Sequence, residues 1–218
     1  MAIPFPRLFS GASRLVRRAF APILLFAITL GGCSFNLGSL SPEPDQDASP
    51  KAAPTGPSIA EAQAVTAQGE ALARSGKTEE ALAEFDKAIA LDPHNANALY
   101  NRGLIYQNQR QHQLAIDDFT SASGLTPQRP EPLLARAISY LAMDRLKEAA
   151  ADLDEAVQAD PQNAQIWTTR GLAYERIGDK TKAAGSYGRA INLRPKDEAA
   201  RSGFARVGGK PGQSYDTF

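Results

Sequence analysis

Few residues of this 218-residue chain combine the types and spacings that catalysis or metal binding requires. His94 and His112 are the two histidines, and neither has a cysteine or histidine partner at the spacing of zinc ligands. No serine or cysteine nucleophile has a base at a recognisable spacing. The sequence therefore predicts that the chain is not an enzyme and holds no metal or cofactor.

Two groups of acidic residues are the remaining candidates for proton transfer. Asp117-Asp118 and Asp152-x-Asp154 fall in segments with a helical pattern. Adjacent carboxylates on a helix are more often solvated than engaged in acid–base chemistry. We therefore expect these side chains to face water.

The stretch Ser75-Gly76-Lys77-Thr78 matches the end of a Walker A phosphate-binding loop. The complete motif needs a glycine five residues before Gly76, and that position is Ala71. It also needs a preceding strand, whereas a helical pattern precedes this stretch. The sequence predicts a tight turn between two helices, with Thr78 as the N-cap, rather than a nucleotide site.

A single constant period organises most of the chain. Each period ends in a proline, with alanines five and twelve residues before it and a large apolar residue eight before it. Further upstream, three more positions recur at fixed offsets. In chain order they hold a large apolar residue, a small residue, and a leucine or tyrosine. The equally spaced prolines are Pro93, Pro127, Pro161 and Pro195; the small residues are Gly69, Gly103, Ala137 and Gly171. A repeat as long as the interval between two of these prolines is typical of stacked helical hairpins.

These offsets resemble the tetratricopeptide repeat, whose pattern is Trp-x2-Leu-Gly-x2-Tyr, Ala-x3-Phe, an alanine and a closing proline. The resemblance covers residues 62–197 and implies an all-α solenoid of helical hairpins. Four repeats are expected at residues 62–95, 96–129, 130–163 and 164–197. We expect a capping helix over 198–207, with Ala199, Phe204 and Val207 on its buried side. A disordered tail is expected over 208–218.

Within each repeat the pattern predicts two antiparallel helices. The first helices are expected at Ala62–Ser75, Ala96–Gln109, Pro130–Met143 and Ala164–Ile177. The second helices are expected at Thr78–Leu91, His112–Leu125, Leu146–Ala159 and Lys180–Leu193. Small residues such as Gly103 should face the alanine twelve positions later, here Ala115, so that two backbones approach closely. Asn95 and Asn163 are placed to cap the following helices.

Residues 1–32 have the composition of a bacterial export signal. They contain four arginines and no acidic residue, and the apolar run Ala19–Leu30 is too short to span a bilayer comfortably. Leu30-Gly31-Gly32-Cys33 resembles the lipobox of bacterial lipoproteins, which implies lipidation of Cys33 and cleavage before it. A retained signal anchor, or an incidental cysteine, is the alternative. Residues 33–61 then form a lipid-anchored, proline-rich disordered tether.

The export signal and the residue after Cys33 bear on localisation. Arg17-Arg18-Ala19-Phe20 weakly resembles a twin-arginine signal, and ordinary Sec export is favoured. Ser34 follows the cysteine, and by the sorting rule of enteric bacteria this favours the outer membrane over the inner. From Cys33 onward the chain has 20 basic and 24 acidic residues, a balance that argues against a nucleic-acid partner.

The first helix of each repeat lines the binding groove in proteins with this fold. The groove-facing offsets predict that a protein or peptide partner contacts Tyr100, Asn101, Leu104, Leu134, Ile138, Leu141 and Leu172. Repeats that bind chaperone tails use a clamp of lysine, asparagine and arginine, of which only Asn101 is present. An exposed apolar patch usually marks a partner site, although a one-residue error in helix phase would place half of these residues in the core.

Arg102, Arg136 and Arg170 recur at one offset in three repeats. Arginines at such regular intervals either read a series of phosphates or carboxylates, or lie along neighbouring helices with the head group paired to an acid. The structural role is favoured.

The resemblance implies a non-enzymatic interaction scaffold in the bacterial cell envelope. Lipid-anchored tetratricopeptide-repeat proteins include those that recruit peptidoglycan hydrolases and proteases (NlpI-like) and the pilotins that help assemble pilus secretins. The repeats do not choose between these two classes. The alternative is a periplasmic, chaperone-like assembly factor for outer-membrane proteins.

Overall fold

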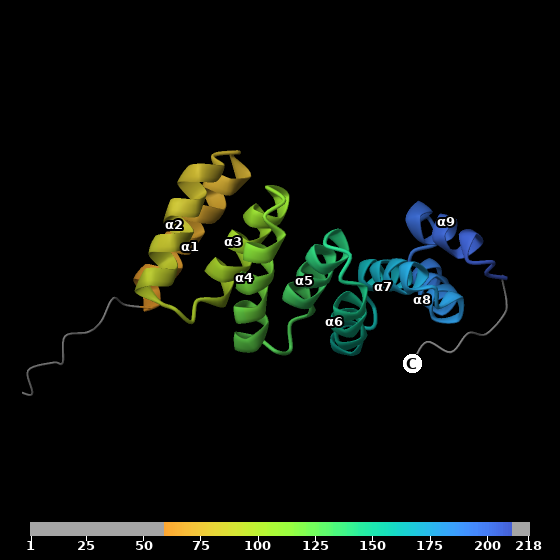
Figure 1. Cartoon of the computed structure of the whole chain (residues 1–218). Coiled ribbons are helices and arrows are strands. Elements are labelled where there is room, and N and C mark those ends of the chain that lie inside the picture. Colours follow the sequence, from red (N-terminus) through yellow and green to blue (C-terminus); the bar gives the residue numbers. More distant parts are fainter. Residues whose placement is uncertain (1–58, 211–218) are drawn as a thin grey trace, which may run out of the picture. The chain divides into compact units, whose positions relative to one another are not determined.

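The computed structural model describes residues 59–210, which form four helical hairpins followed by a single helix (Figure 1). The first helices are α1 (Ile59–Arg74), α3 (Ala96–Asn108), α5 (Pro130–Ala142) and α7 (Ala164–Ile177). The second helices are α2 (Thr78–Leu91), α4 (His112–Leu125), α6 (Leu146–Ala159) and α8 (Lys180–Leu193), and α9 (Glu198–Arg206) comes last. Within these residues there is no strand, and the predicted all-α solenoid of four repeats with a terminal helix is confirmed.

The predicted helix boundaries agree closely with the structure. All four second helices begin and end at the predicted residues. Helix α1 begins at Ile59, three residues before the predicted start, and α1, α3, α5 and α9 each end one residue early. The predicted signal segment, Cys33 and most of the tether, as well as the tail from residue 211, lie outside the described residues.

The contacts between helices define an inner and an outer side of the array. Each first helix contacts the next one, so that α1 touches α3, α3 touches α5, and α5 touches α7. Among the described helices, no Cα atoms of consecutive second helices come within 8 Å of each other; each second helix packs on its own first helix and on the first helix that follows. The first helices therefore lie close together on an inner face, and the second helices diverge on the outside.

The two helices of a hairpin approach closely because a small residue on one lies under a ring of the other. A Cβ atom added to Gly103 would lie 2.7 Å from Cε1 of Phe119, and Gly171 stands in the same relation to Tyr187. We predicted Ala115 as the partner of Gly103, but the nearest side chain is the ring sixteen residues later. The space that a missing side chain leaves is filled by a large one rather than closed by two small ones.

The turns inside the hairpins share one backbone conformation. One residue in each turn has a positive φ, and the next N–H donates back to a carbonyl five residues earlier, for example Gln111 to Tyr106 at 2.8 Å. Glycine adopts this conformation without strain, but two of the turns use other residues. The four positions are separated by the same interval as the prolines: Gly76 (φ 79°), Arg110 (61°), Asp144 (60°) and Gly178 (93°).

Helix capping agrees with prediction at the turns between repeats but not in the first hairpin. The side chains of Asn95 and Asn163 accept hydrogen bonds from backbone N–H groups at the starts of α3 and α7, which confirms both as N-caps. In the first hairpin, Lys77 occupies the N-cap position of α2 and Thr78 is already helical. The prediction of Thr78 as N-cap is wrong, whereas the predicted turn around Gly76 is present.

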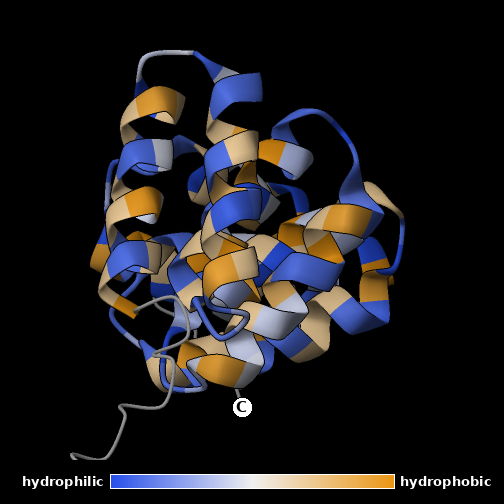
Figure 2. Ribbon diagram, turned by 90° about the vertical axis from the view of Figure 1, so that its left-hand side faces the viewer, coloured by the Kyte–Doolittle hydropathy of each residue, from blue (hydrophilic) through white to orange (hydrophobic). Residues whose placement is uncertain are grey.

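The core lies both inside the hairpins and between neighbouring hairpins, in apolar clusters that follow one another along the array. Polar and apolar residues alternate along each ribbon, so that each helix has an apolar side (Figure 2). The largest fully buried side chains are those of Tyr187, Phe85, Phe119, Leu153 and Ile166. Four of these five come from second helices, each of which sends one large side chain into its own hairpin.

Helix α9 covers the end of the fourth hairpin, as predicted, but with a different set of residues. Ala200 is fully buried and Gly203 is buried, while Phe204 and Val207 are partly buried. Ala199, which we expected on the buried side, is exposed. Two of the three predicted residues thus lie on the covered side, where Ala200 and Gly203 take the place of Ala199.

An ion pair and a ring hold α9 in place. The Arg206 guanidinium donates two hydrogen bonds to the Glu175 carboxylate, at 2.7 and 2.9 Å, and the Tyr187 hydroxyl donates a third at 2.6 Å. Hydrogen bonds from Arg206 lower the pKa of Glu175, and burial raises the pKa of Tyr187. The Tyr187 ring lies so close to Gly203 that a side chain has no room there.

The contact between Gly103 and Phe119 can be tested with a single methyl group. Gly103→Ala should lower the free energy of unfolding by about 1–3 kcal/mol, because the added Cβ overlaps the ring edge. In Gly124→Ala the new Cβ meets nothing within 4 Å, so this matched control should leave stability unchanged or slightly raised. Urea denaturation measures both. Equal midpoints for the two variants would contradict the proposed close approach.

Candidate interaction surface

The structure places six of the seven predicted groove residues where a partner can reach them at least in part. Leu172 is the most exposed apolar residue of the set, at 39% of its full accessible area. Tyr100, Leu104, Leu134 and Ile138 are partly buried, and so is Asn101. Their side chains come from α3, α5 and α7, the first helices that form the inner face. Their role in binding stays a prediction.

Leu141 does not belong to this surface. Its side chain is only 6% exposed and is part of the apolar cluster that α5, α6, α7 and α8 share. The cause is its place in the last turn of α5, where the next hairpin closes over it. The Arg176 guanidinium of α7 donates to the Leu141 carbonyl at 2.7 Å. The predicted partner contact at Leu141 is therefore a core contact.

A depression of about 570 Å³ opens between the first two hairpins on the inner side. Asn101 and Leu104 line it, and its other walls come from the end of α1, the start of α2 and the end of α3. The Asn101 amide donates to Glu70 at 3.0 Å and to the Asn97 carbonyl at 2.9 Å. The side chain of Arg74 at the rim is 72% exposed. Apolar and amide groups side by side suit an extended peptide, whose backbone needs hydrogen-bond partners.

Tyr100 adds an aromatic group to the inner face. Its ring packs against Phe119 with the centroids 5.8 Å apart and the planes tilted by 49°. Burial raises the pKa of the Tyr100 phenol, and the nearby Glu131 carboxylate adds to that effect. Among the described residues, no hydrogen bond to the Tyr100 hydroxyl is found. A tyrosine with a packed ring and a free hydroxyl is the kind of side chain that dominates many protein interfaces.

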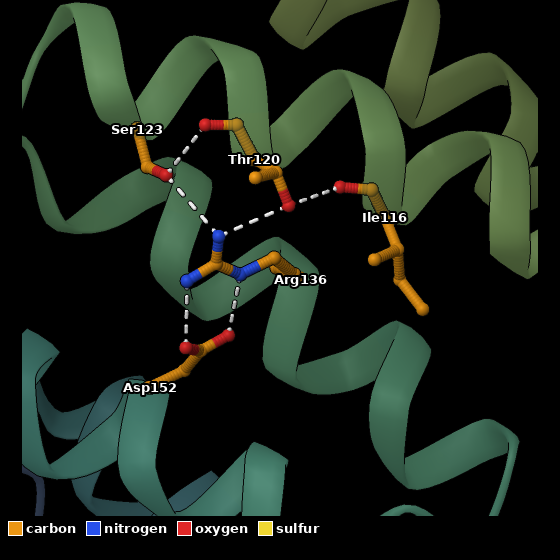
Figure 3. A network of polar contacts seen from close by, with 5 residues as sticks. All are labelled: Ile116, Thr120, Ser123, Arg136 and Asp152. Atoms are coloured by element: carbon orange, nitrogen blue, oxygen red, sulfur yellow. Dashed lines mark hydrogen bonds and ion pairs between the residues drawn. The ribbon is translucent and has the colours of Figure 1, made fainter.

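The three regularly spaced arginines are fully engaged in structural pairs. Figure 3 shows Arg136, whose Nε and Nη2 donate to the two carboxylate oxygens of Asp152, both at 2.8 Å. Its Nη1 donates to the hydroxyls of Thr120 and Ser123 on the preceding second helix, at 3.1 and 3.3 Å. One guanidinium thus joins α5 to both α4 and α6.

The same geometry repeats along the array, and we call it the arginine ladder (Arg102, Arg136 and Arg170 with their partners). Each arginine reaches a residue sixteen positions later on its own second helix and one sixteen positions earlier on the preceding one. Arg102 bonds Asp118 in this way at 2.7 Å and Asp86 at 2.7 Å. Arg170 bonds Ser186 at 2.8 Å and Asp154 at 2.7 Å.

The ladder corrects one expectation and confirms another. Asp118 and Asp152 are 5% and 7% exposed, so the prediction that they face water is wrong. The arginines pair with acids and are largely buried, with side chains 21%, 15% and 3% exposed for Arg102, Arg136 and Arg170, as the structural interpretation predicted. The spacing of sixteen, visible in the sequence between Arg102 and Asp118 and between Arg136 and Asp152, was the signal that would have found these pairs.

Comparison with known proteins bears directly on this architecture. A family model described as a TPR repeat matches residues 69–109, and two models described as tetratricopeptide repeat match residues 96–129 and 134–198. Together the matches span more than half of the chain. The chain belongs to the tetratricopeptide-repeat family. None of the matching models describes an enzyme, and no relative among the curated proteins matches the sequence.

Solved structures with the same fold support this assignment. The MamA protein is 20% identical, with a TM-score of 0.63 over 67% of this chain and 80% of its own. YrrB, described as a TPR protein with an unusual peptide-binding site, is 20% identical, with a TM-score of 0.61 over 66% and 74%. The first repeat domain of RPAP3, solved with an HSP90 peptide, is 24% identical, with a TM-score of 0.51 over 52% and 92%. Likeness at these identities shows the fold.

At the two ends of the tetratricopeptide array, other residues take the positions of the arginine ladder. In the first repeat Gln68 takes the arginine position and donates to Glu84 at 3.4 Å, leaving Oε2 of Glu84 buried without a hydrogen-bond partner among the described residues. In α9 the same position is Phe204, and it packs over Gly188, which replaces the acid of the preceding helix. The ladder thus ends in an amide at one side and an apolar contact at the other.

The histidines and acidic residues of the described part of the chain are dispersed over the array. They contain no group of three potential metal ligands. His94 and His112 stand apart, and the Nδ1 atom of His112 is buried without a hydrogen-bond partner. None of the helices in this part of the chain has the length and apolar character that crossing a membrane needs.

The ladder predicts a strong asymmetry between removing one partner and removing both. Asp152→Ala should lower the free energy of unfolding by about 3–5 kcal/mol, because it leaves the largely buried Arg136 guanidinium without its carboxylate. Arg136→Met combined with Asp152→Leu should cost much less, since apolar side chains of similar volume need no hydrogen bonds. Urea denaturation of the single and double variants completes the cycle. Additive losses would show that the two groups do not act as a pair.

Proposed function

We propose that this protein is a non-enzymatic adaptor that binds a segment of a partner protein along its inner face. The observation that carries the proposal is the set of inner-face side chains that the described part of the chain covers only in part. Leu172, Leu104 and Tyr100 present apolar or aromatic groups there, and Asn101 lines the nearby depression. Exposed apolar groups gathered on one face usually mark a partner site.

Charge supports the same surface and sets the character of binding. The ladder uses Arg102, Arg136 and Arg170 to hold helices together, so none of them is available to a phosphate or carboxylate on the partner. Tetratricopeptide proteins act as protein-interaction scaffolds, and the RPAP3 domain was solved with a peptide bound. Here the cations of a carboxylate clamp are missing, and we infer that apolar contacts dominate with little dependence on salt.

The setting that we propose is the bacterial envelope. The motif that ends in Cys33 favours a diacylglyceryl anchor, and the chain would then face the periplasm, on the outer membrane rather than the inner. Recruitment of envelope enzymes, as in NlpI-like proteins, and assistance to pilus assembly, as in pilotins, are the two roles that fit such an adaptor. The proline-rich residues 34–58 would give the array a tether of up to about 75 Å when extended.

The anchor predicts a clear biochemical phenotype. In Cys33→Ser the acyl acceptor is lost, so the precursor should stay unprocessed and its incorporation of labelled fatty acid should disappear. The readouts are the apparent mass in the envelope fraction and metabolic labelling with palmitate. If the variant is still cut to the mature size and still floats with membranes, the protein is not a lipoprotein of this kind.

The inner face can be tested by photo-crosslinking in the cell. A benzophenone amino acid at position 172 should form adducts with a partner, whereas the same probe at position 114 should not. Leu114 is a matched control because it is 47% exposed but lies on α4, on the outer side. Leu172→Asp should reduce co-purification of the crosslinked partner at least about tenfold without lowering the melting temperature, and Leu114→Asp should have no effect.

Two outcomes of this experiment would change the proposal. Adducts from position 114 alone would move the binding surface to the second helices. The identity of the partner separates the adaptor from the assembly-factor alternative, since an adaptor should crosslink to a folded enzyme or a secretin segment. Unfolded precursors of outer-membrane barrels among the adducts would favour the chaperone-like role.

A further inference from the structure

The charges of the array are separated along the chain, although the chain as a whole is neutral. Residues 59–163 contain 16 acidic and 9 basic residues, whereas residues 164–210 contain 4 acidic and 10 basic residues. The formal charge therefore changes from −7 over the first three repeats to +6 over the last repeat and α9. A surface designed only for solubility would mix the two signs.

Several cations at the C-terminal end of the array have no partner inside it. Arg206 pairs with Glu175, and Lys182 lies over the Tyr174 ring at 4.8 Å. Among the described residues, no hydrogen bond or ion pair is found for the side chains of five other cations. One of them, Arg194, acts electrostatically on the nearby Asp197 carboxylate. The other four, which we call the basic end, are Lys180, Arg189, Lys196 and Arg201.

Arg201 shows that the basic end departs from the repeat pattern. Its position in α9 corresponds to that of Leu99, Leu133 and Trp167 in the first helices, where the side chain is buried. No second helix follows α9 among the described residues, and the position is exposed. A neutral polar residue would suffice to solvate this face, so an arginine here adds charge beyond what a cap needs.

The opposite end of the array has no cap in the described part of the chain. Ala64 and Ala71 occupy the positions that face the preceding hairpin in the later repeats. In α7 those positions are Ile166 and Ala173, both fully buried. In α1 they are exposed, and Ile59 at the start of the helix is 65% exposed. We call this face of α1 the open end.

The hairpin that carries the open end is acidic. The first repeat, residues 59–95, contains 7 acidic and 3 basic residues. The two terminal parts of the array are thus opposite in net charge, and the first of them exposes a helix side that the repeat pattern normally buries. Opposite patches of this kind attract one another and orient the encounter between proteins.

We propose that copies of this protein associate head to tail, with the open end of one copy docked on the basic end of the next. A second copy fits because it carries both complementary surfaces. The contact is heterologous, so each pair of copies still has one free open end and one free basic end. Further copies can therefore add to it and form short linear oligomers. It does not use the inner face, and neighbouring copies would offer several partner sites at once.

Sedimentation velocity on residues 33–218 carrying Cys33→Ser tests the association. At low ionic strength the weight-average sedimentation coefficient should rise with protein concentration. At about 0.5 M sodium chloride, where the Debye length falls to about 4 Å, the rise should disappear. A sedimentation coefficient that stays at the monomer value up to about 100 μM at low salt would overturn the proposal, and would leave the segment before Ile59, or nothing, as the cover of the open end.

Two variants, each with one end blocked, distinguish head-to-tail contact from any other. The open-end variant carries Ala64→Arg and Ala71→Arg, and the basic-end variant carries Arg189→Gln, Lys196→Gln and Arg201→Gln. Each should be monomeric alone, because each lacks one half of the contact. An equal mixture should form a one-to-one dimer, since the intact basic end of the first meets the intact open end of the second.

The control carries the same added charge on the outer side. Ala90→Arg and Ala151→Arg are exposed positions on α2 and α6, and this variant should associate within about twofold of the unmodified chain. A mixture of the two blocked variants that remains monomeric would overturn the proposal, and so would association that either blocked variant retains. Because crosslinking at position 172 does not depend on the ends, failure here leaves the proposed partner site intact.

Discussion

A helical hairpin cannot bury both of its apolar sides by itself, and the rest of this structure depends on that constraint. Inside each hairpin one side is closed by a large side chain: Phe119 and Tyr187 lie directly on Gly103 and Gly171, and so fix the distance between the two helices. The other apolar side is covered only when the next hairpin packs against it. Every interior residue therefore relies on a neighbour in the array, and both ends pose a problem. Helix α9 solves it at one end, with Ala200 and Gly203 against the last hairpin.

The arginine ladder is the polar counterpart of these apolar layers. Each guanidinium joins two second helices, and the acidic partners Asp118 and Asp152 are buried, whereas Asp154 beside Arg170 is 41% exposed. A buried charge is costly unless it is paired and hydrogen-bonded, and the two-point contact satisfies that condition. The neighbouring tyrosines share in it: the Tyr174 hydroxyl donates to Asp154 at 2.7 Å, and burial together with this bond raises the pKa of Tyr174 to about 12.

The placement of the ladder divides the molecule into surfaces with different tasks. Charges that hold the array together lie between the second helices, so the inner face is left with apolar side chains, amides and the rim of a depression. Recognition there rests on shape and apolar contact rather than on ion pairs. The ends form a third kind of surface, where the repeat pattern stops and the charge changes sign. An adaptor that binds its partner on the inner face and its own copies through its ends uses no surface twice.

The sequence alone determined the architecture, because the constant interval between Pro93, Pro127, Pro161 and Pro195 and the periodicity of a helix are local patterns that tertiary context does not change. It predicted every second helix to the residue, and its two asparagine caps are confirmed. Only the tertiary structure decided which side chain meets which. Leu141 is buried because the next hairpin closes over the last turn of α5, and on α9 it is Ala200 rather than Ala199 that faces the last hairpin. Pairs such as Gly103 with Phe119, or Arg136 with Asp152, join residues on different helices, so their identity follows from how the helices cross rather than from either helix alone.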